Sequence, residues 1–167
     1  MPSPCILCKA ECCRNHLITV TAFDVLRLYG DGYRVQDFAQ FAPCKILNYD
    51  NNMVLEFHDS GVAEDRILAL KSNPCYFLEN GQCSIHKIAP SVCKAYPLNS
   101  SGKMIGKLCP GIPRLLHRLV GTEVRREYAK EIDAYRGIVA EWNRGRGGMR
   151  DCMPFMLERA EEERKKF

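Results

Sequence analysis

Hydrophobic positions in the last third of the chain recur every three or four residues, which is the period of one face of an α-helix. The repeating residues are Val124, Tyr128, Ile132, Tyr135, Val139 and Trp142. Thr122 precedes them as a candidate N-cap, and a glycine-rich break at 145–148 separates this helix from a final one over 153–166. The pattern predicts two C-terminal helices whose apolar stripe packs against the rest of the chain or against a partner protein.

The remainder of the chain has shorter apolar runs, which predict short helices and strands. Thr21 and Asp24 mark the start of a helix over 22–29, because a Thr side chain can cap the helix and an acidic residue favours the first-turn amides. A second short helix is expected over 35–41, where Pro43 closes it.

Tight-turn sequences predict two small hairpins in the first hundred residues. Short strands are expected over 17–20, 45–49, 53–57, 76–78, 82–85 and 104–108. Asp-Asn-Asn at 50–52 would link the second strand to the third, and Asn80-Gly81 would link the fourth to the fifth. Residues 66–71 fit a strand or a short helix, and 87–95 fit one or two helical turns.

These elements predict an α+β fold with two parts. Residues 1–112 would form a small irregular cysteine-rich metal-binding domain with short hairpins and helices, and residues 113–167 a C-terminal helical extension. The full length of 167 residues suits one domain with such an appendage.

Composition and charge restrict the environment and the partners. The formal net charge is +4 and acidic residues interleave with basic ones, so no nucleic-acid partner is expected. No apolar run approaches the roughly 18 residues of a membrane span, and the N-terminus lacks a signal-peptide pattern. We therefore expect no membrane association and a cytoplasmic location. In that reducing compartment, ten cysteines are more typical of metal ligation than of disulfides.

Eight of the cysteines fall into two groups of four. The first group is Cys5, Cys8, Cys12 and Cys13, and the second is Cys75, Cys83, Cys93 and Cys109. Two intervening residues let Cys5 and Cys8 bind one ion or cluster corner, whereas the neighbours Cys12 and Cys13 would point to opposite faces of an extended chain and serve two sites. Eight thiols are the ligand count for two tetrathiolate sites, or for one such site and a smaller one.

Other residues near the cysteines leave alternatives open. The basic neighbours are Lys9, Arg14, Lys94 and Lys107, which are either stabilising cations beside thiolates or ordinary surface charges. His16 and His86 are either additional ligands or histidines beside the ligands or on the surface. The isolated Cys44 and Cys152 are predicted to be packed thiols.

The cysteine groups and their neighbours resemble a known family. The matching segments are Cys5, Cys8, Cys12 and Cys13, then Cys75-Tyr-Phe77-Leu78, Gly81-Gln-Cys83-Ser-Ile85 and Pro90-Ser-Val-Cys93-Lys-Ala-Tyr96-Pro97. Over about residues 5–112 the chain resembles the YkgJ-like cysteine-cluster family of zinc- or iron-chelating domains. It departs from the family in the three residues between Cys8 and Cys12, and in Ala89 and Lys94, where arginine is usual.

The resemblance implies metal or iron–sulfur binding. It also implies a link to protein methylation, because flagellin lysine methylases carry a similar domain. Zinc and iron–sulfur clusters both accept four thiolates. Structural zinc sites usually show two Cys-x-x-Cys pairs per ion, and this chain has one such pair, so its scattered ligands favour one or two iron–sulfur clusters of the 4Fe-4S type, with zinc as the alternative.

Two functions of different classes follow from these observations. The first is an electron-transfer, cluster-carrying or assembly module that docks on a protein partner through its C-terminal helices. The second is an enzyme related to protein lysine methylation, which rests on the family analogy alone. The sequence shows no catalytic constellation and no nucleotide-binding loop, so we favour the module and expect no catalytic residues.

Overall fold

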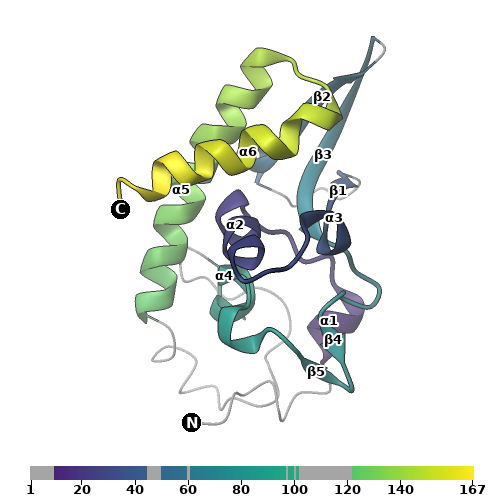
Figure 1. Cartoon of the computed structure of the whole chain (residues 1–167), viewed down its shortest axis with the longest axis vertical. Coiled ribbons are helices and arrows are strands. Elements are labelled where there is room, and N and C mark those ends of the chain that lie inside the picture. The colour runs from purple at the N-terminus through teal and green to yellow at the C-terminus, as the bar shows by residue number, and fades with distance from the viewer. Residues whose placement is uncertain (1–9, 45–49, 60, 97, 100, 102–121) are drawn as a thin grey trace.

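The computed structural model describes residues 10–44, 50–59, 61–96, 98–99, 101 and 122–167, with side chains from residue 126 onward in the last segment. The elements in chain order are α1 (Glu11–Asn15), α2 (Ala22–Gly30), α3 (Val35–Phe38), β1 (Ala39–Pro43), the 3-10 turn η2 (Asn51–Met53), β2 (Leu55–Asp59), β3 (Val62–Leu70), β4 (Leu78–Glu79), β5 (Gln82–Cys83), the 3-10 turn η3 (His86–Ile88), α4 (Ser91–Ala95), α5 (Thr122–Gly145) and α6 (Met149–Arg164). The predicted α+β class is confirmed (Figure 1).

A three-stranded antiparallel sheet forms the centre of the fold, with β3 between β1 and β2. The last four residues of β3 are all buried, because successive side chains point to opposite faces and both faces are covered. Leu68 and Leu70 join the main core, whereas Ile67 and Ala69 join a smaller apolar cluster. Of the two alternatives for residues 66–71, the structure therefore contains the strand.

Several predicted strands and turns differ in the structure. Residues 39–41, expected at the end of a helix, belong to β1, because they pair with Leu68–Leu70 along the edge of β3. Residues 17–20 contribute a single bridge, Thr19 to Ala69, rather than a strand. Asp50 accepts a hydrogen bond from the Asn52 N–H (3.0 Å) and starts a 3-10 turn in place of the predicted hairpin turn.

Within the described chain, the strand predicted over 53–57 pairs with β3, a partner that the sequence did not predict. β2 forms its hairpin with β3, and Leu55 lies opposite Arg66 in that register. The predicted strands over 45–49 and 104–108 lie outside the described residues.

The second predicted hairpin is confirmed. β4 and β5 pair across Asn80 and Gly81, whose φ angles are 49° and 76°. Both angles lie in the left-handed region that a tight hairpin turn requires and that Asn and Gly adopt most readily. Leu78 thereby lies opposite Cys83.

Local capping explains the helix boundaries. Thr21 and Asp24 form the capping box expected at the start of α2, where each side chain accepts the backbone N–H of the other. Among the described residues α5 begins at Thr122, and the capping role predicted for that side chain lies outside the described side chains. α6 begins at Met149, four residues earlier than predicted, because the Asp59 carboxylate accepts the Met149 N–H (3.0 Å) from across the chain.

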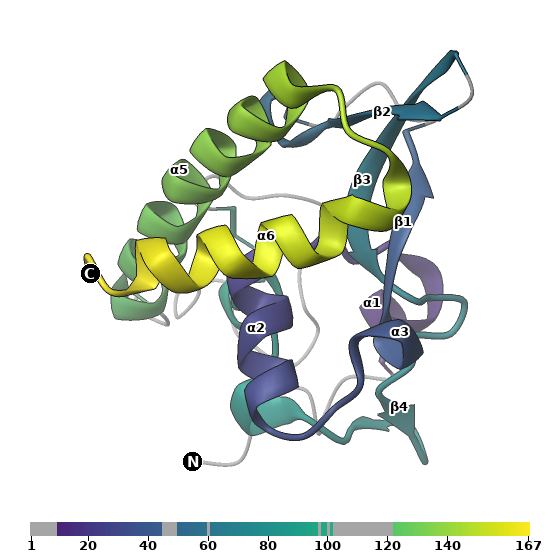
Figure 2. The ribbon, with the colours of Figure 1, turned by 45° about the horizontal axis from the view of Figure 1, so that its top comes forward.

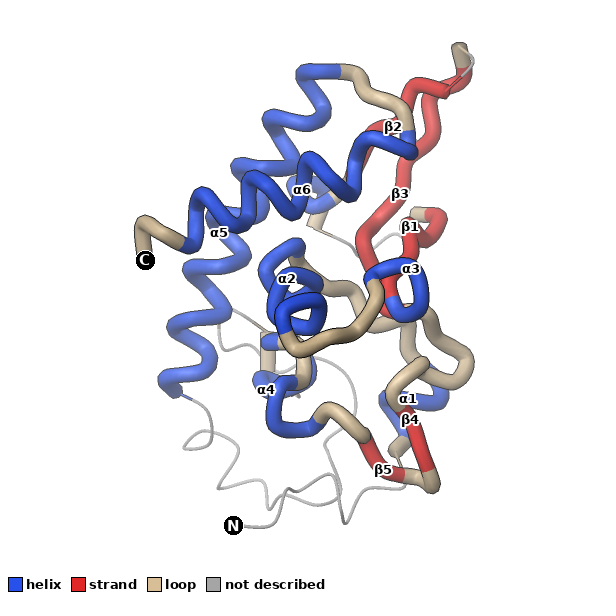
Figure 3. Tube along the Cα trace, viewed as in Figure 1, coloured by secondary structure: helices blue, strands red, loops and turns tan. Residues whose placement is uncertain are grey.

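The two long helices lie on one side of the sheet (Figures 2 and 3), and α6 packs on both α2 and α5. The described residues of the α5 stripe are all buried in the main core: Tyr128, Ile132, Tyr135, Val139 and Trp142. Gly147, after α5, lies so close to Trp142 that a Cβ there would stand 2.3 Å from the indole Cη2. In the described chain, no helix has both the length and the apolar character needed to span a membrane.

Candidate metal centre

Five of the eight predicted ligand cysteines meet at one small cavity. They are Cys12 and Cys13 from α1, Cys75 from the turn before β4, Cys83 from β5 and Cys93 from α4. The cavity has a volume of about 40 Å³. Thiols from the front of the chain and from its middle are thus brought to the same place, although Cys75 lies 62 positions after Cys13.

The backbone of α1 explains why neighbouring thiols reach the same cavity. Ala10 adopts a left-handed conformation (φ 56°, ψ 35°) and starts a single helical turn that contains Cys12 and Cys13. Consecutive side chains in a helix are about 100° apart, whereas they are opposed in an extended chain. The extended backbone assumed for these two cysteines is therefore wrong, because the chain is helical there and both side chains line the same cavity.

A backbone hydrogen bond joins the two cysteine groups. The Cys75 N–H donates to the Cys13 carbonyl at 2.7 Å. The Asn-Gly turn then returns the chain so that Cys83 lines the same cavity as Cys75, as the turn sequence predicted.

A buried polar network fixes the start of α4, the helix that carries Cys93. Asp24, only 1% exposed, accepts the Ser91 N–H at 2.8 Å. The Ser91 hydroxyl donates to Glu131 at 2.9 Å, and Arg27 donates to Ser91 Oγ at 2.8 Å while it ion-pairs with both Asp24 and Glu131. The sequence predicted the capping role of Asp24 but gave no sign of Glu131, which lies 104 residues from Arg27.

The thiols influence one another's charge. A hydrogen bond from the Cys13 thiol lowers the pKa of Cys12 to about 6 and raises the pKa of Cys13. Burial raises the pKa of Cys75 and, to a greater extent, that of Cys93, and the Cys12 thiolate adds repulsion in both cases. These pKa shifts favour the thiolate form of Cys12 and the neutral form of Cys13, Cys75 and Cys93. A bound cation reverses this preference, because it stabilises every thiolate that it contacts.

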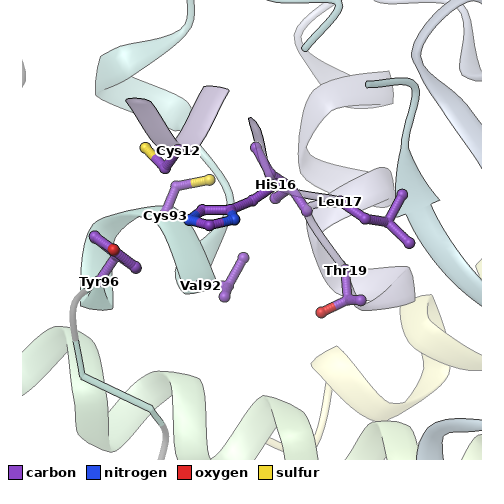
Figure 4. A pocket seen from close by; sticks show the side chains of 8 residues that line it. Cys12, His16, Leu17, Thr19, Val92, Cys93 and Tyr96 are labelled. Atoms are coloured by element: carbon purple, nitrogen blue, oxygen red, sulfur yellow. The ribbon is translucent and has the colours of Figure 1, made fainter. Parts of the chain in front are cut away.

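A second, larger pocket of about 280 Å³ adjoins the cysteine cavity (Figure 4). It is lined by Cys12, His16, Leu17, Ile18, Thr19, Val92, Cys93 and Tyr96. Figure 4 shows the His16 imidazole directed toward Cys93, with the Cys12 side chain close by. We call this space the outer pocket. The sequence did not predict it, because its apolar residues come from two segments with no shared periodicity.

The other candidate residues occupy different places. His86 and Lys94 line the cysteine cavity, and Arg14 is exposed on α1. Cys152 is completely buried in the main core and Cys44 packs against the smaller apolar cluster, so both agree with the prediction of packed thiols. The remaining predicted ligands and cations lie outside the described residues: Cys5, Cys8, Cys109, Lys9 and Lys107.

The described thiols do not surround a single point. Within the described part of the chain, no three Cys, His, Asp or Glu side chains form a ready-made ion site. The cavity nevertheless offers the donor set that zinc and iron–sulfur clusters accept, which is several cysteine sulfurs facing one space.

Comparison with known proteins agrees with this geometry. The family model CxxCxxCC, described as a putative zinc- or iron-chelating domain, matches residues 4–110. The chain belongs to this family. The matched range of the CxxCxxCC domain includes all eight predicted ligand cysteines. No curated protein and no solved structure matches the chain.

Proposed function

We propose that the cysteine cavity holds an iron–sulfur cluster of the 4Fe-4S type. Membership in a family of zinc- or iron-chelating domains supports metal binding in general. The observation that carries the finer proposal is the gathering of five cysteines at one cavity, which can supply the four thiolates of a 4Fe-4S cluster. The scattered origin of these thiols, from four separate elements, also differs from the paired cysteines of structural zinc sites.

The residues around the cavity suit such a group. Cys13, Cys75, Cys83 and Cys93 would provide four thiolates, with Cys12 beside them and Cys5, Cys8 and Cys109 as further proposed ligands. Lys94 lines the cavity beside His86 and is positioned to reduce the net negative charge of a thiolate site. A bound cluster would supply one-electron chemistry.

We propose that the protein uses the cluster as an electron-transfer or cluster-carrying module for a protein partner. The described apolar stripe of α5 is already buried in the protein's own core. A partner that contacts the C-terminal helices would therefore meet their exposed polar faces, which include Glu127, Lys130 and Glu161.

Zinc is the second candidate, and the size of the cavity favours it. A space of about 40 Å³ corresponds to roughly three water molecules at 10–15 Å³ each. One ion with its thiolates needs no more room than this, whereas a four-iron cluster requires the surrounding turns to move outward.

Purification without oxygen, followed by metal and sulfide analysis, tests the proposal. An iron–sulfur protein should be brown, with about four iron and four acid-labile sulfide per cluster. Colourless protein with bound zinc would support the second candidate, and metal-free protein would contradict both.

Matched cysteine variants locate the site. Cys75→Ser and Cys93→Ser should each lower the metal content by half or more, because each removes a thiol at the cavity. Cys44→Ser is the control and should leave the metal content unchanged, since Cys44 packs in a different cluster. Equal metal content in all three variants would contradict the assignment of this cavity.

A further inference from the structure

The outer pocket shares part of its lining with the cysteine cavity. Cys12, Ile18 and Cys93 line both spaces. These three side chains therefore form the partition between them. Cys13, Cys75 and Cys83 line the cysteine cavity only, so the two thiols of the partition are the ones that a molecule in the outer pocket would meet first.

The volume and lining of the outer pocket indicate what kind of molecule it accepts. Its volume of about 280 Å³ approaches the lower end of the range for small-molecule sites. None of the described residues that line it is a Lys, Arg, Asp or Glu. An anionic molecule would lose hydration there without gaining a Lys or Arg partner from these residues, whereas a neutral aromatic molecule would bury apolar surface.

We propose that the outer pocket is a binding site through which a small, neutral, largely apolar metal ligand reaches the centre. This inference rests on the proposed function, because it requires a metal held in the cysteine cavity. Cys93, one of the four proposed ligands, and Cys12 beside it are then the thiols nearest to the incoming molecule. Leu17, Val92 and Tyr96 supply the apolar walls that hold its body.

The rate of metal removal by two chelators of different charge tests the inference. The metal-loaded protein is treated with 1,10-phenanthroline, a neutral flat chelator, or with EDTA, which is anionic. Removal by phenanthroline should accelerate with its concentration, because the chelator binds next to the metal. Removal by EDTA should be limited by spontaneous release of the metal and should not accelerate.

Filling the outer pocket should slow metal removal by phenanthroline but not by EDTA. Thr19→Phe and Val92→Phe each place a ring in the outer pocket and should slow removal by phenanthroline at least tenfold, with metal content and EDTA rate unchanged. Val62→Phe is the control, because Val62 is 61% exposed on β3 and does not line the pocket. Equal phenanthroline rates in these variants and in the control would overturn the inference.

A competitor supplies a test that needs no substitution. 1,7-Phenanthroline has almost the same shape but cannot chelate, so an excess of it should occupy the outer pocket and slow removal by the 1,10 isomer. Absence of competition would overturn the inference and leave metal binding intact. Protein that contains no metal would overturn the proposed function, and the inference with it.

Discussion

The hydroxyl group of Tyr135 lies in the middle of the core without a hydrogen-bond partner among the described residues. The side chain is completely buried, and burial raises the pKa of the hydroxyl. A buried polar group without a partner loses its hydration and gains nothing in return. The Tyr135 ring therefore stabilises the folded protein through packing, whereas its buried hydroxyl oxygen lowers the free energy of unfolding.

Removal of this oxygen should therefore not destabilise the protein. We expect Tyr135→Phe to leave the free energy of unfolding unchanged or to raise it by up to about 2 kcal/mol. Urea denaturation followed by circular dichroism measures the difference. Tyr29→Phe is the control and should have no effect, because Tyr29 is 57% exposed. A loss of more than about 1 kcal/mol in Tyr135→Phe would show that the hydroxyl has a partner.

For single residues, the sequence predicted which side chains are candidate ligands better than it predicted how those side chains are oriented. Residue type and the Asn-Gly turn were sufficient to predict that Cys75 and Cys83 meet, because the turn itself imposes their proximity. The shared orientation of Cys12 and Cys13 could not be predicted. It depends on a left-handed Ala10, and alanine has no intrinsic preference for that conformation.

Between elements, the ion-pair network around Arg27 ties α2 to both α4 and α5. Arg27 is 30% exposed at its side chain, but its partners Asp24 and Glu131 are only 1% and 13% exposed. Loss of the guanidinium would leave two largely buried carboxylates close to each other and to Ser91. Such uncompensated charges are costly in a protein interior.

We expect Arg27→Met to lower the free energy of unfolding by about 2–3 kcal/mol. Arg136→Met is the matched control, with an expected loss below about 1 kcal/mol, because its pairs with Asp50 and Asp133 are more exposed. Urea denaturation of the two variants decides the comparison. Equal losses would mean that the burial of the Arg27 network has no energetic consequence.

The elements that the sequence predicted well are those defined by local chemistry. The capping box of α2 and the tight turn between β4 and β5 depend on side chains a few residues apart. The local pattern predicts a helix at residues 39–41, because nothing nearby indicates β3, which begins about twenty residues later and pairs with them. Pairing between distant segments decided that case, and a local pattern does not contain that information.

In the whole molecule, the cysteine end and the helical end share one core. Buried Cys75 and Phe77 belong to the same apolar cluster as Tyr135 and Trp142. This continuity could not be inferred from periodicity, which identified the α5 stripe as a packing face without specifying what covers it.

Metal removal should therefore have consequences beyond the cavity. Metal binding contributes on the order of 10–16 kcal/mol in small structural zinc sites, compared with about 5–15 kcal/mol for the net stability of a domain. We expect the fully chelated protein to be partly unfolded, with reduced helical circular dichroism and a lower melting temperature. Unchanged spectra and melting temperature after complete chelation would show that the centre is not structural.

The position of Trp142 gives the molecule a built-in optical reporter. It is the only tryptophan in the chain, and its indole N–H donates to the Glu56 carbonyl at 3.0 Å between Phe57 and Phe155. β2 and the C-terminal end of α5, which carry Phe57 and Trp142, lie at the end of the molecule opposite α1, β4 and β5 (Figure 1). Tryptophan emission therefore reports on the helical end, whereas metal absorbance reports on the cysteines. During unfolding, a delay between the two signals would show that one end of the molecule comes apart before the other.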